Sequence, residues 1–172
     1  DIRKLLDKVL DVAAPNAQAQ QIRVERDYAP ALPEIWADGR HVKTCFLNLV
    51  LNAMQAMTPH GGTLTVTARS VNSWGGESVD SSGPIHQSTN PPIHTNDHFV
   101  EVTFADTGVG IAPEHLPHVF EPYFTTKEVG IGLGLALTKQ ILEEHGGRID
   151  LASEAGKGTV ARLRLPAGAA SA

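Results

Sequence analysis

Apolar residues recur at helical spacing in three segments of the chain. The first segment covers residues 1–14 and is expected to end at Pro15, because proline does not continue an α-helix. The second follows Asp38, a residue well suited to cap a helix start, and continues to about Met57. The third covers residues 133–145 and is expected to end at the two glycines that follow.

Alternation of apolar and polar residues predicts β-strands between and after these helices. The predicted strands are residues 21–26, 61–69, 99–105, 148–153 and 159–166. The last two are expected to form a hairpin, with Gly156 and Gly158 in its turn.

The predicted strands share one polar and one apolar face. Polar residues occupy one set of alternate positions: Thr65, Thr67, Glu101, Thr103, Arg148, Asp150, Arg162 and Arg164. Apolar residues occupy the other set: Leu64, Val66, Val100, Val102, Ile149, Leu151, Ala161 and Leu163. Such a sheet needs helices on its apolar face only. Because most strands are adjacent in sequence, the pattern predicts an α/β two-layer sandwich with a mixed, mostly antiparallel sheet.

Two stretches fall outside this periodic pattern. Residues 71–97 are rich in serine, glycine, proline and asparagine, which is typical of a long flexible loop between neighbouring strands. Residues 167–172 are small and are expected to be disordered. A length of 172 residues suits one hydrophobic core. We therefore expect a single domain over residues 1–166, a flexible insertion at about 71–97 and a disordered tail at 167–172.

Composition excludes several classes of protein. A share of 41% apolar and 19% charged residues is ordinary for a globular domain, and the net charge of -5 argues against a nucleic-acid-binding protein. The single cysteine excludes an internal disulfide, and no apolar run approaches the ~20 residues of a membrane helix. The chain has no signal peptide and does not begin with Met, so we expect a fragment of a longer protein.

A narrow polar stripe follows the second helix. On a helical wheel it contains His41, Thr44, Asn48, Asn52 and Gln55, and almost all other positions are apolar. A helix buried on most sides needs hydrogen-bond partners for such a stripe. Amide oxygens can ligate a hard cation that also holds phosphate oxygens. Alternatively, the two asparagines satisfy nearby backbone groups.

Asp106 follows a predicted buried strand and precedes two glycines. Its position two residues after Phe104 directs it toward the packed side of the sheet, where a carboxylate needs strong hydrogen bonds. The exocyclic amine of a purine would supply one, and Gly108 and Gly110 would let the backbone approach a flat ligand. Alternatively, Asp106 caps its own turn by bonding the backbone.

Gly130, Gly132 and Gly134 lead directly into the third helix. A helix start presents free N–H groups and a positive dipole end, which suit phosphate. The segment is neither a Walker loop, which needs Gly-Lys-Ser/Thr, nor a Rossmann fingerprint, which has a different glycine spacing. Alternatively, these glycines serve flexibility or packing only.

Five segments in a fixed order carry a resemblance to a known family. They are residues 48–53 (NLVLNA), 106–110 (DTGVG), 120–127 (FEPYFTTK), 130–135 (GIGLGL) and 156–159 (GKGT). Together they resemble the ATP-binding boxes of bacterial sensor histidine kinases, whose catalytic domains belong to the GHKL or Bergerat-fold superfamily. The resemblance covers essentially the whole chain apart from residues 71–97 and the tail. It implies a Bergerat ATP-binding fold with ATP and Mg²⁺ as cofactors.

The resemblance also implies roles for individual residues. Asn52 would be the Mg²⁺ ligand, Asn48 would support phosphate and metal one turn earlier, and Lys127 would offer a cation to the phosphates. The remaining implied nucleotide contacts are Asp106, Gly108, Gly110 and Thr159 at adenine, Phe120 and Phe124 at the ends of a mobile lid, and Gly130, Gly132, Leu133 and Gly134 under the triphosphate.

Three positions depart from the family's pattern. Ile131 stands where many relatives have threonine, and Gln55 stands where many have a basic residue. The segment from residue 128 to 131 is short, so we expect a compact lid. We therefore expect the lid to lack one hydroxyl contact and the phosphates to receive less positive charge from the second helix.

The resemblance favours phosphoryl transfer over hydrolysis. ATPases of this fold carry a glutamate base one turn before the metal-binding asparagine, whereas this chain has Asn48, which is no useful base. The alternatives are a GHKL-type ATPase and a protein-serine kinase or nucleotide-sensing module. The eight histidines all lack the acidic residue and proline that follow the family's phosphoacceptor.

The resemblance therefore implies that the acceptor histidine lies on a dimerisation domain upstream of this chain. The expected reaction transfers the γ-phosphoryl of Mg-ATP to that histidine in two-component signal transduction, with a response regulator as the next partner. We expect the chain itself to bind ATP and ADP, to be monomeric, and to lie in the cytoplasm, either free or as the cytoplasmic part of a membrane-bound sensor.

Overall fold

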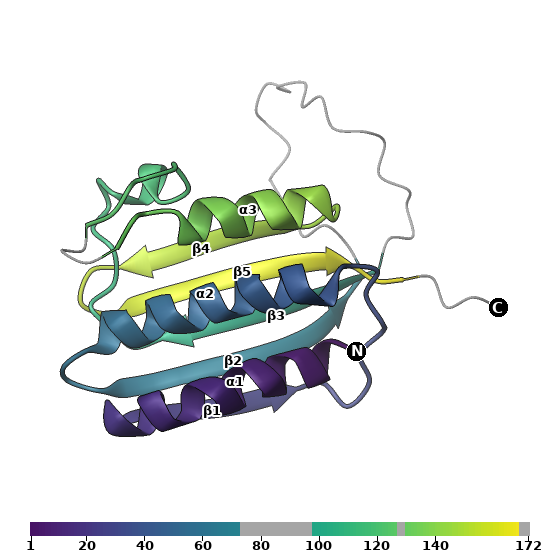
Figure 1. Ribbon diagram of the computed structural model, residues 1–172, viewed down its shortest axis with the longest axis horizontal. Helices are drawn as coiled ribbons and strands as arrows, with labels where there is room; N and C mark the ends of the chain where they lie inside the picture. Colours follow the sequence, from purple (N-terminus) through teal and green to yellow (C-terminus); the bar gives the residue numbers. More distant parts are fainter. Residues whose placement is uncertain (73–97, 127–129, 169–172) are drawn as a thin grey trace, which may run out of the picture.

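The computed structural model describes residues 1–72, 98–126 and 130–168. The elements in these ranges are α1 (Ile2–Ala19), β1 (Ile22–Tyr28), α2 (Gly39–Met57), β2 (Gly62–Val71), β3 (Phe99–Asp106), the 3-10 helix η1 (Leu116–His118), α3 (Gly134–Glu144), β4 (Arg148–Glu154) and β5 (Gly158–Pro166) (Figure 1).

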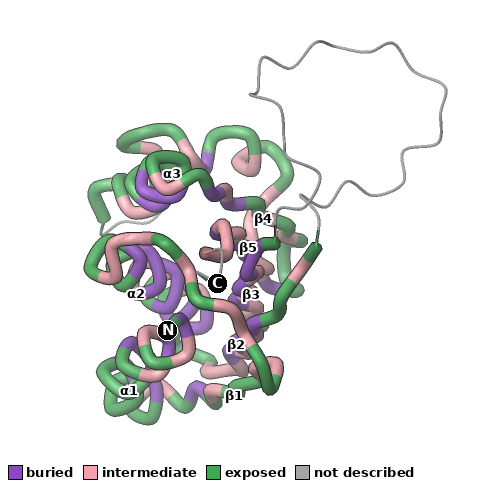
Figure 2. Tube along the Cα trace, turned by 90° about the vertical axis from the view of Figure 1, so that its right-hand side faces the viewer, coloured by how far each residue is buried: buried purple, intermediate pink, exposed green. Residues whose placement is uncertain are grey.

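The sheet has the strand order β1-β2-β3-β5-β4. β1 and β2 are parallel, and the other three neighbouring pairs are antiparallel. The helices α1, α2 and α3 lie side by side on one face of the sheet, and the other face carries no helix among the described residues (Figures 1 and 2). The predicted mixed, mostly antiparallel two-layer sandwich is therefore confirmed.

The core lies between the sheet and the helices, as the alternation of apolar residues predicts. Leu64, Val66, Val102 and Leu163 are fully or almost fully buried. Figure 2 shows buried positions concentrated where α2 faces the central strands. Thr67, Thr103 and Arg162 project from the opposite face and are more exposed. No helix in the described part of the chain is long and apolar enough to cross a membrane.

The first helix corrects an expectation. Pro15 lies inside α1, which continues to Ala19. Proline removes one hydrogen bond to the carbonyl four residues earlier. Burial of apolar surface at the end of the helix offsets this loss of stability. Ala17 is only 2% exposed and belongs to the hydrophobic core, so tertiary packing carries the helix past the proline.

The ends of the sheet also differ from the expected boundaries. β1 extends to Tyr28, because its last two residues still pair with Thr67 and Ala68 of β2. Arg26 also binds Asp7 and Asp11 of α1 at 3.0 and 2.7 Å. Val71, which the sequence placed in the loop, is the last residue of β2 and pairs with Phe99 of β3. Residues 73–97 lie outside the described part of the chain.

The expected tail begins later than the sequence indicated. The backbone N–H of Ala167 donates to His98 O at 2.8 Å, and that of Gly168 donates to Glu34 O at 2.7 Å. Ala167 also forms a bridge with Ile35. These backbone bonds keep both residues attached to the sheet, and residues 169–172 lie outside the described part of the chain.

Candidate functional site

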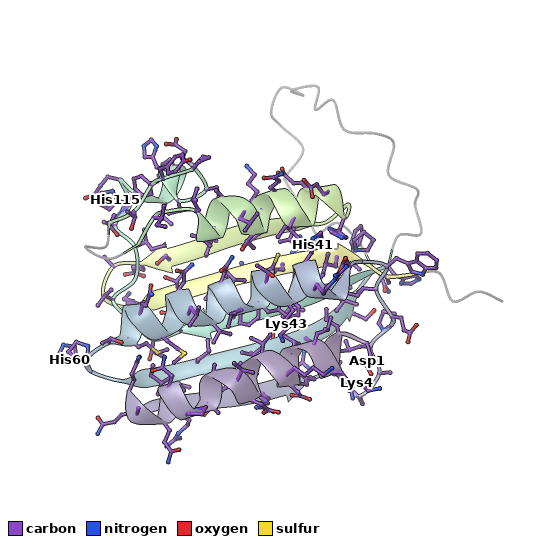
Figure 3. All side chains as sticks on the ribbon, viewed as in Figure 1. Asp1, Lys4, His41, Lys43, His60 and His115 are labelled. Carbon is purple, nitrogen blue, oxygen red and sulfur yellow. The ribbon has the colours of Figure 1, made fainter. Side chains whose placement is uncertain are left out.

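A cavity of about 630 Å³ lies between α2, the end of β3, the start of α3 and the segment between β3 and α3. This volume is typical of small-molecule sites. His115 is one of its lining residues. Figure 3 shows His115 at one end of the molecule and His41, at the start of α2, toward the opposite end. The cavity therefore occupies one end of the sandwich.

The polar stripe of α2 divides into two parts. Asn48, Asn52 and Gln55 line the cavity. His41 instead packs edge-on against His145 at 5.8 Å between ring centroids, and the Thr44 hydroxyl donates to Arg40 O within the helix at 3.1 Å. The stripe therefore has two kinds of partner, because the first turn of α2 faces the end of α3.

Asn48 also uses its side chain within the protein. Its Nδ2 donates to Gly134 O at 3.3 Å and to Thr138 Oγ1 at 3.4 Å, both on α3. The alternative that this amide satisfies a nearby backbone group therefore holds for its NH₂ group. The same residue still lines the cavity, so both roles meet at one side chain.

Asp106 is held by backbone N–H groups at the cavity wall. Its Oδ1 accepts from Gly108 N at 2.9 Å and from Thr159 N at 3.3 Å. The first bond is the capped turn that the sequence left as an alternative. The second ties the end of β3 to β5, so the carboxylate has a fixed orientation where it lines the cavity.

The two glycines after Asp106 also have a role in packing that the sequence analysis did not predict. A Cβ on Gly108 would lie 2.6 Å from Ala56 O, and one on Gly110 would lie 2.1 Å from Glu154 O. Gly110 also has φ +68°. Close backbone packing therefore requires glycine at both positions, and of the two only Gly110 is among the lining residues.

Thr159 belongs to a small hydroxyl network beside Asp106. Ser153 Oγ lies 2.9 Å from Thr159 Oγ1, accepts from Ile111 N at 2.8 Å and donates to Gly158 O at 2.9 Å. Because Ser153 uses its one hydroxyl proton to donate to Gly158 O, the hydroxyl of Thr159 must be the donor in its bond with Ser153. The sequence analysis missed Ser153, although a serine at an inward position of β4 after Ile149 and Leu151 was a usable signal.

The glycine-rich segment reaches the cavity as expected. Gly130, Gly132, Leu133 and Gly134 all line it. Gly132 has φ +71°, and its carbonyl accepts from Tyr123 N at 2.9 Å. Leu133 is the N-cap of α3 and has an apolar side chain, so the first N–H groups of this helix need other partners.

A family model described as "Histidine kinase-, DNA gyrase B-, and HSP90-like ATPase" matches residues 37–169. The chain belongs to this ATPase family. The Bergerat ATP-binding fold that the resemblance implies is thereby confirmed.

Curated relatives in this family are sensor kinases. The chain is 36% identical over 166 residues to sensor histidine kinase ZraS of Escherichia coli (strain K12), an alignment that covers 96% of this chain and 30% of that protein. It is 34% identical over 169 residues to sensory histidine kinase/phosphatase NtrB of Rhizobium leguminosarum bv. phaseoli, covering 97% and 40%. The chain thus spans less than half the length of both relatives.

Solved structures agree with this assignment. Full-length ShkA in complex with AMPPNP has a TM-score of 0.73 and 26% identity, covering 99% of this chain and 31% of that one. The catalytic domain of histidine kinase ThkA has a TM-score of 0.73 and 24% identity, covering 97% and 93%. The second likeness shows the shared fold of the ATPase family over almost the whole length of both chains.

The two lid phenylalanines lie in different places in this member of the ATPase family. Phe124 lines the cavity, with its ring centroid 5.7 Å from those of both His115 and His118. Phe120 is not among the lining residues; it packs against the core and has Lys139 Nζ 5.7 Å from its ring centroid. Lys127, the expected cation of the lid, lies outside the described residues.

His115 is a lining residue that the sequence analysis considered only as a phosphoacceptor. Among the described residues that line the cavity, it is the one side chain able to carry a positive charge. Cys45, one turn before Asn48, lies behind the cavity wall, and burial raises the pKa of its thiol to about 11. The thiol behind Asn48 is therefore uncharged at neutral pH.

Proposed function

We propose that this chain is the ATP-binding catalytic domain of a sensor histidine kinase, which transfers the γ-phosphoryl group of Mg-ATP to a histidine on another domain. The observation that carries the proposal is that residues from all of the sequence boxes, far apart in the chain, line or border one cavity. The family match and the sensor kinases among the relatives support it.

We assign the adenine end of the cavity to Asp106 and its neighbours. A carboxylate accepts from an exocyclic amine, and a charged acceptor makes a stronger bond than a neutral one. Thr159 and Gly110 border the same region, and the bonds from Gly108 N and Thr159 N keep the Asp106 carboxylate oriented. This arrangement would select adenine over guanine, which offers a carbonyl oxygen at the corresponding position.

We assign the phosphate end to the asparagines of α2 and the glycines before α3. Amide oxygens suit Mg²⁺, so Asn52 would ligate the ion and Asn48 would support it and the phosphates. The bound ion would neutralise charge on the phosphates during transfer. The start of α3, with Gly132 and Gly134 at the cavity, would offer N–H groups and the positive end of its dipole.

The lining residues favour transfer over hydrolysis. Asp106 is the one carboxylate among the described residues around the cavity, and it belongs to the adenine end. Asn48 occupies the position where ATPases of this fold carry their base and cannot accept a proton usefully. Catalysis would then rest on positioning and charge neutralisation, with the nucleophile supplied by a second domain.

The wider setting is part of the same proposal. We place the domain at residues 1–168 and its activity in the cytoplasm, with a histidine-bearing dimerisation domain upstream and a response regulator as the recipient of the phosphoryl group. The sequence also assigns a phosphate contact to Lys127 and the ends of a mobile lid to Phe120 and Phe124, and these roles remain predictions.

The test is transfer of radiolabelled γ-phosphate from ATP to the histidine-bearing domain of the same protein, added as a separate polypeptide. We expect acid-labile, base-stable label on that domain and none on this chain. Asn52→Ala should abolish labelling, while Asn16→Ala, on the exposed end of α1, should leave it unchanged. Base-labile serine label, or rapid ATP hydrolysis by the 172-residue chain alone, would overturn the proposal.

A further inference from the structure

Thr138 is the one polar side chain that is fully buried among the described residues, with 0% exposure. It lies on α3, one turn after Gly134, and faces α2. Its Oγ1 is 3.4 Å from Asn48 Nδ2, so its hydroxyl accepts from a residue of the candidate site. A hydroxyl buried at such a position needs a partner, and the side chain of Asn48 is that partner.

The contacts of Asn48 determine which way its amide points. Gly134 O, 3.3 Å from Nδ2, is a carbonyl and can only accept, so the NH₂ group must be the one that faces α3. The opposite orientation would bring two acceptor oxygens together. The two N–H groups of the Asn48 amide thus match two acceptors on α3. The amide oxygen, Oδ1, is therefore directed away from that helix.

The surroundings make these bonds effective. Cys45 Sγ, one turn earlier on α2, contacts Thr138 O at 3.9 Å, and the thiol is buried. Burial strengthens a hydrogen bond, since water does not compete for its groups. The buried interface between α2 and α3 therefore extends to the cavity, because Asn48 both contacts Thr138 and lines the cavity.

We propose that Thr138 is a positioning residue of the nucleotide site: together with Gly134 O, its hydroxyl fixes the amide of Asn48 so that Oδ1 faces the bound Mg²⁺ and phosphates. The inference rests on the proposed function, because it assigns Oδ1 to that ligand. It also connects the metal end of the site to α3, the helix whose start would bind the phosphates. Thr138 itself touches neither nucleotide nor metal.

The test compares two substitutions at Thr138 with a matched control. Thr138→Val removes the acceptor with little change of shape, Thr138→Ser keeps it, and Thr103→Val makes the same change on the exposed face of the sheet. We expect Thr138→Val to weaken Mg-ATP binding about five- to tenfold, the value of one hydrogen bond. Adenosine, which lacks phosphates, should bind all variants within about twofold of the unchanged chain. Thr138→Ser should restore Mg-ATP binding.

A second readout needs no nucleotide. In NMR spectra of the unchanged 172-residue chain, the side-chain NH₂ of Asn48 should exchange slowly with water, and Thr138→Val should shift and broaden it. The exposed Asn16 side chain serves as the reference.

Equal Mg-ATP binding by the unchanged chain and Thr138→Val would overturn the inference and leave the proposed function intact, whereas failure of the unchanged chain to bind ATP would overturn the function. If Thr138→Val does not fold, fast exchange of the Asn48 NH₂ in the unchanged chain would still overturn the inference.

Discussion

The two ends of the cavity, which we propose to bind adenine and phosphate, are built in different ways. At the adenine end, Asp106, Ser153 and Thr159 are joined to one another and to neighbouring strands by hydrogen bonds to backbone and hydroxyl groups. At the phosphate end, α3 holds the amide of Asn48, but the segment before α3 is exposed. Ile131 in this segment is 74% exposed, and Tyr123, whose N–H donates to Gly132 O, is 73% exposed. The sheet fixes the first end, whereas the second combines a fixed asparagine with an exposed segment.

The difference indicates how ATP would bind. A site that is already ordered pays little entropy on binding, whereas an exposed segment must lose freedom to close on the phosphates. Base recognition would therefore be preformed, and the phosphate contacts of residues 130–133 would form with the ligand. Modest affinity for ATP follows, because ordering of the phosphate end would offset part of the binding energy.

The largest expected effect comes from a glycine at the adenine end. Gly158 has φ +106°, and a Cβ there would lie 1.9 Å from Asp106 O. Gly158→Ala should lower the free energy of unfolding by about 3 kcal/mol or more, through backbone strain and overlap. Gly156→Ala is the control, because Gly156 also has a positive φ, +81°, but a Cβ added there would meet no atom within 4 Å. This substitution should lower the free energy of unfolding by only about 1 kcal/mol. Urea unfolding measures both, and equal losses would show that the adenine end is not rigid.

Asp106→Asn should change which base is preferred. Gly108 N and Thr159 N both donate to Oδ1, so the amide oxygen of the substituted side chain must take that place. Its NH₂ would then face the adenine amine, donor against donor, and ATP binding should weaken about 10- to 100-fold. GTP, with an acceptor oxygen at that position, should lose far less. Calorimetric titration with both nucleotides measures the ratio, and Asp150→Asn on the exposed face is the control. Equal losses for ATP and GTP would contradict a role in base selection.

Hydrogen exchange compares the two ends directly. Without nucleotide, the amides of residues 130–134 should exchange faster than those of Gly108 and Ile111, which are hydrogen-bonded to side chains. Saturation with a non-hydrolysable ATP analogue should slow residues 130–134 by about tenfold or more. A smaller change is expected at Gly108 and Ile111. Equal protection of both ends before nucleotide is added would contradict the comparison.

Tyr123→Gly should have the smallest effect. Tyr123 has φ +67°, a conformation that costs a non-glycine residue about 1–2 kcal/mol, and its ring is exposed. Glycine relieves this strain but adds about 0.5–1 kcal/mol of backbone entropy in the unfolded chain. The net change in the free energy of unfolding should be below about 1 kcal/mol, as measured by urea unfolding. A larger loss would mean that the phosphate end is packed as firmly as the adenine end.

The sequence predicted the helices and strands because their patterns are local. Alternation at Leu64, Val66 and Val102 assigned the inward face of the sheet correctly, and Asp38 marked the start of α2. Pro15 misled the analysis, because local propensity at that residue opposes the helix while burial of Ala17, which depends on the whole fold, supports it.

The candidate site was predictable only in part for the same reason. Asn48, Asn52 and Asp106 were identified because a polar residue in an apolar context is visible in the sequence. Thr138 was not identified, since its partner lies on another helix and the pairing of α2 with α3 is set by packing. The glycines near Asp106 were found, but their packing role was not, because a close approach between Gly110 and Glu154 O appears only in three dimensions.

The pairing of Val71 with Phe99 has a consequence for protein engineering. The two residues end a ladder of eight pairs that begins at Asp106, so they lie at the end of β3 farthest from the cavity. Loop-closure entropy changes slowly with length, and replacing the 25 residues from 73 to 97 by about five would alter it by only about 1.4 kcal/mol. This end of the sheet is therefore a suitable place to join a fluorescent reporter or an affinity handle without disturbing the nucleotide site.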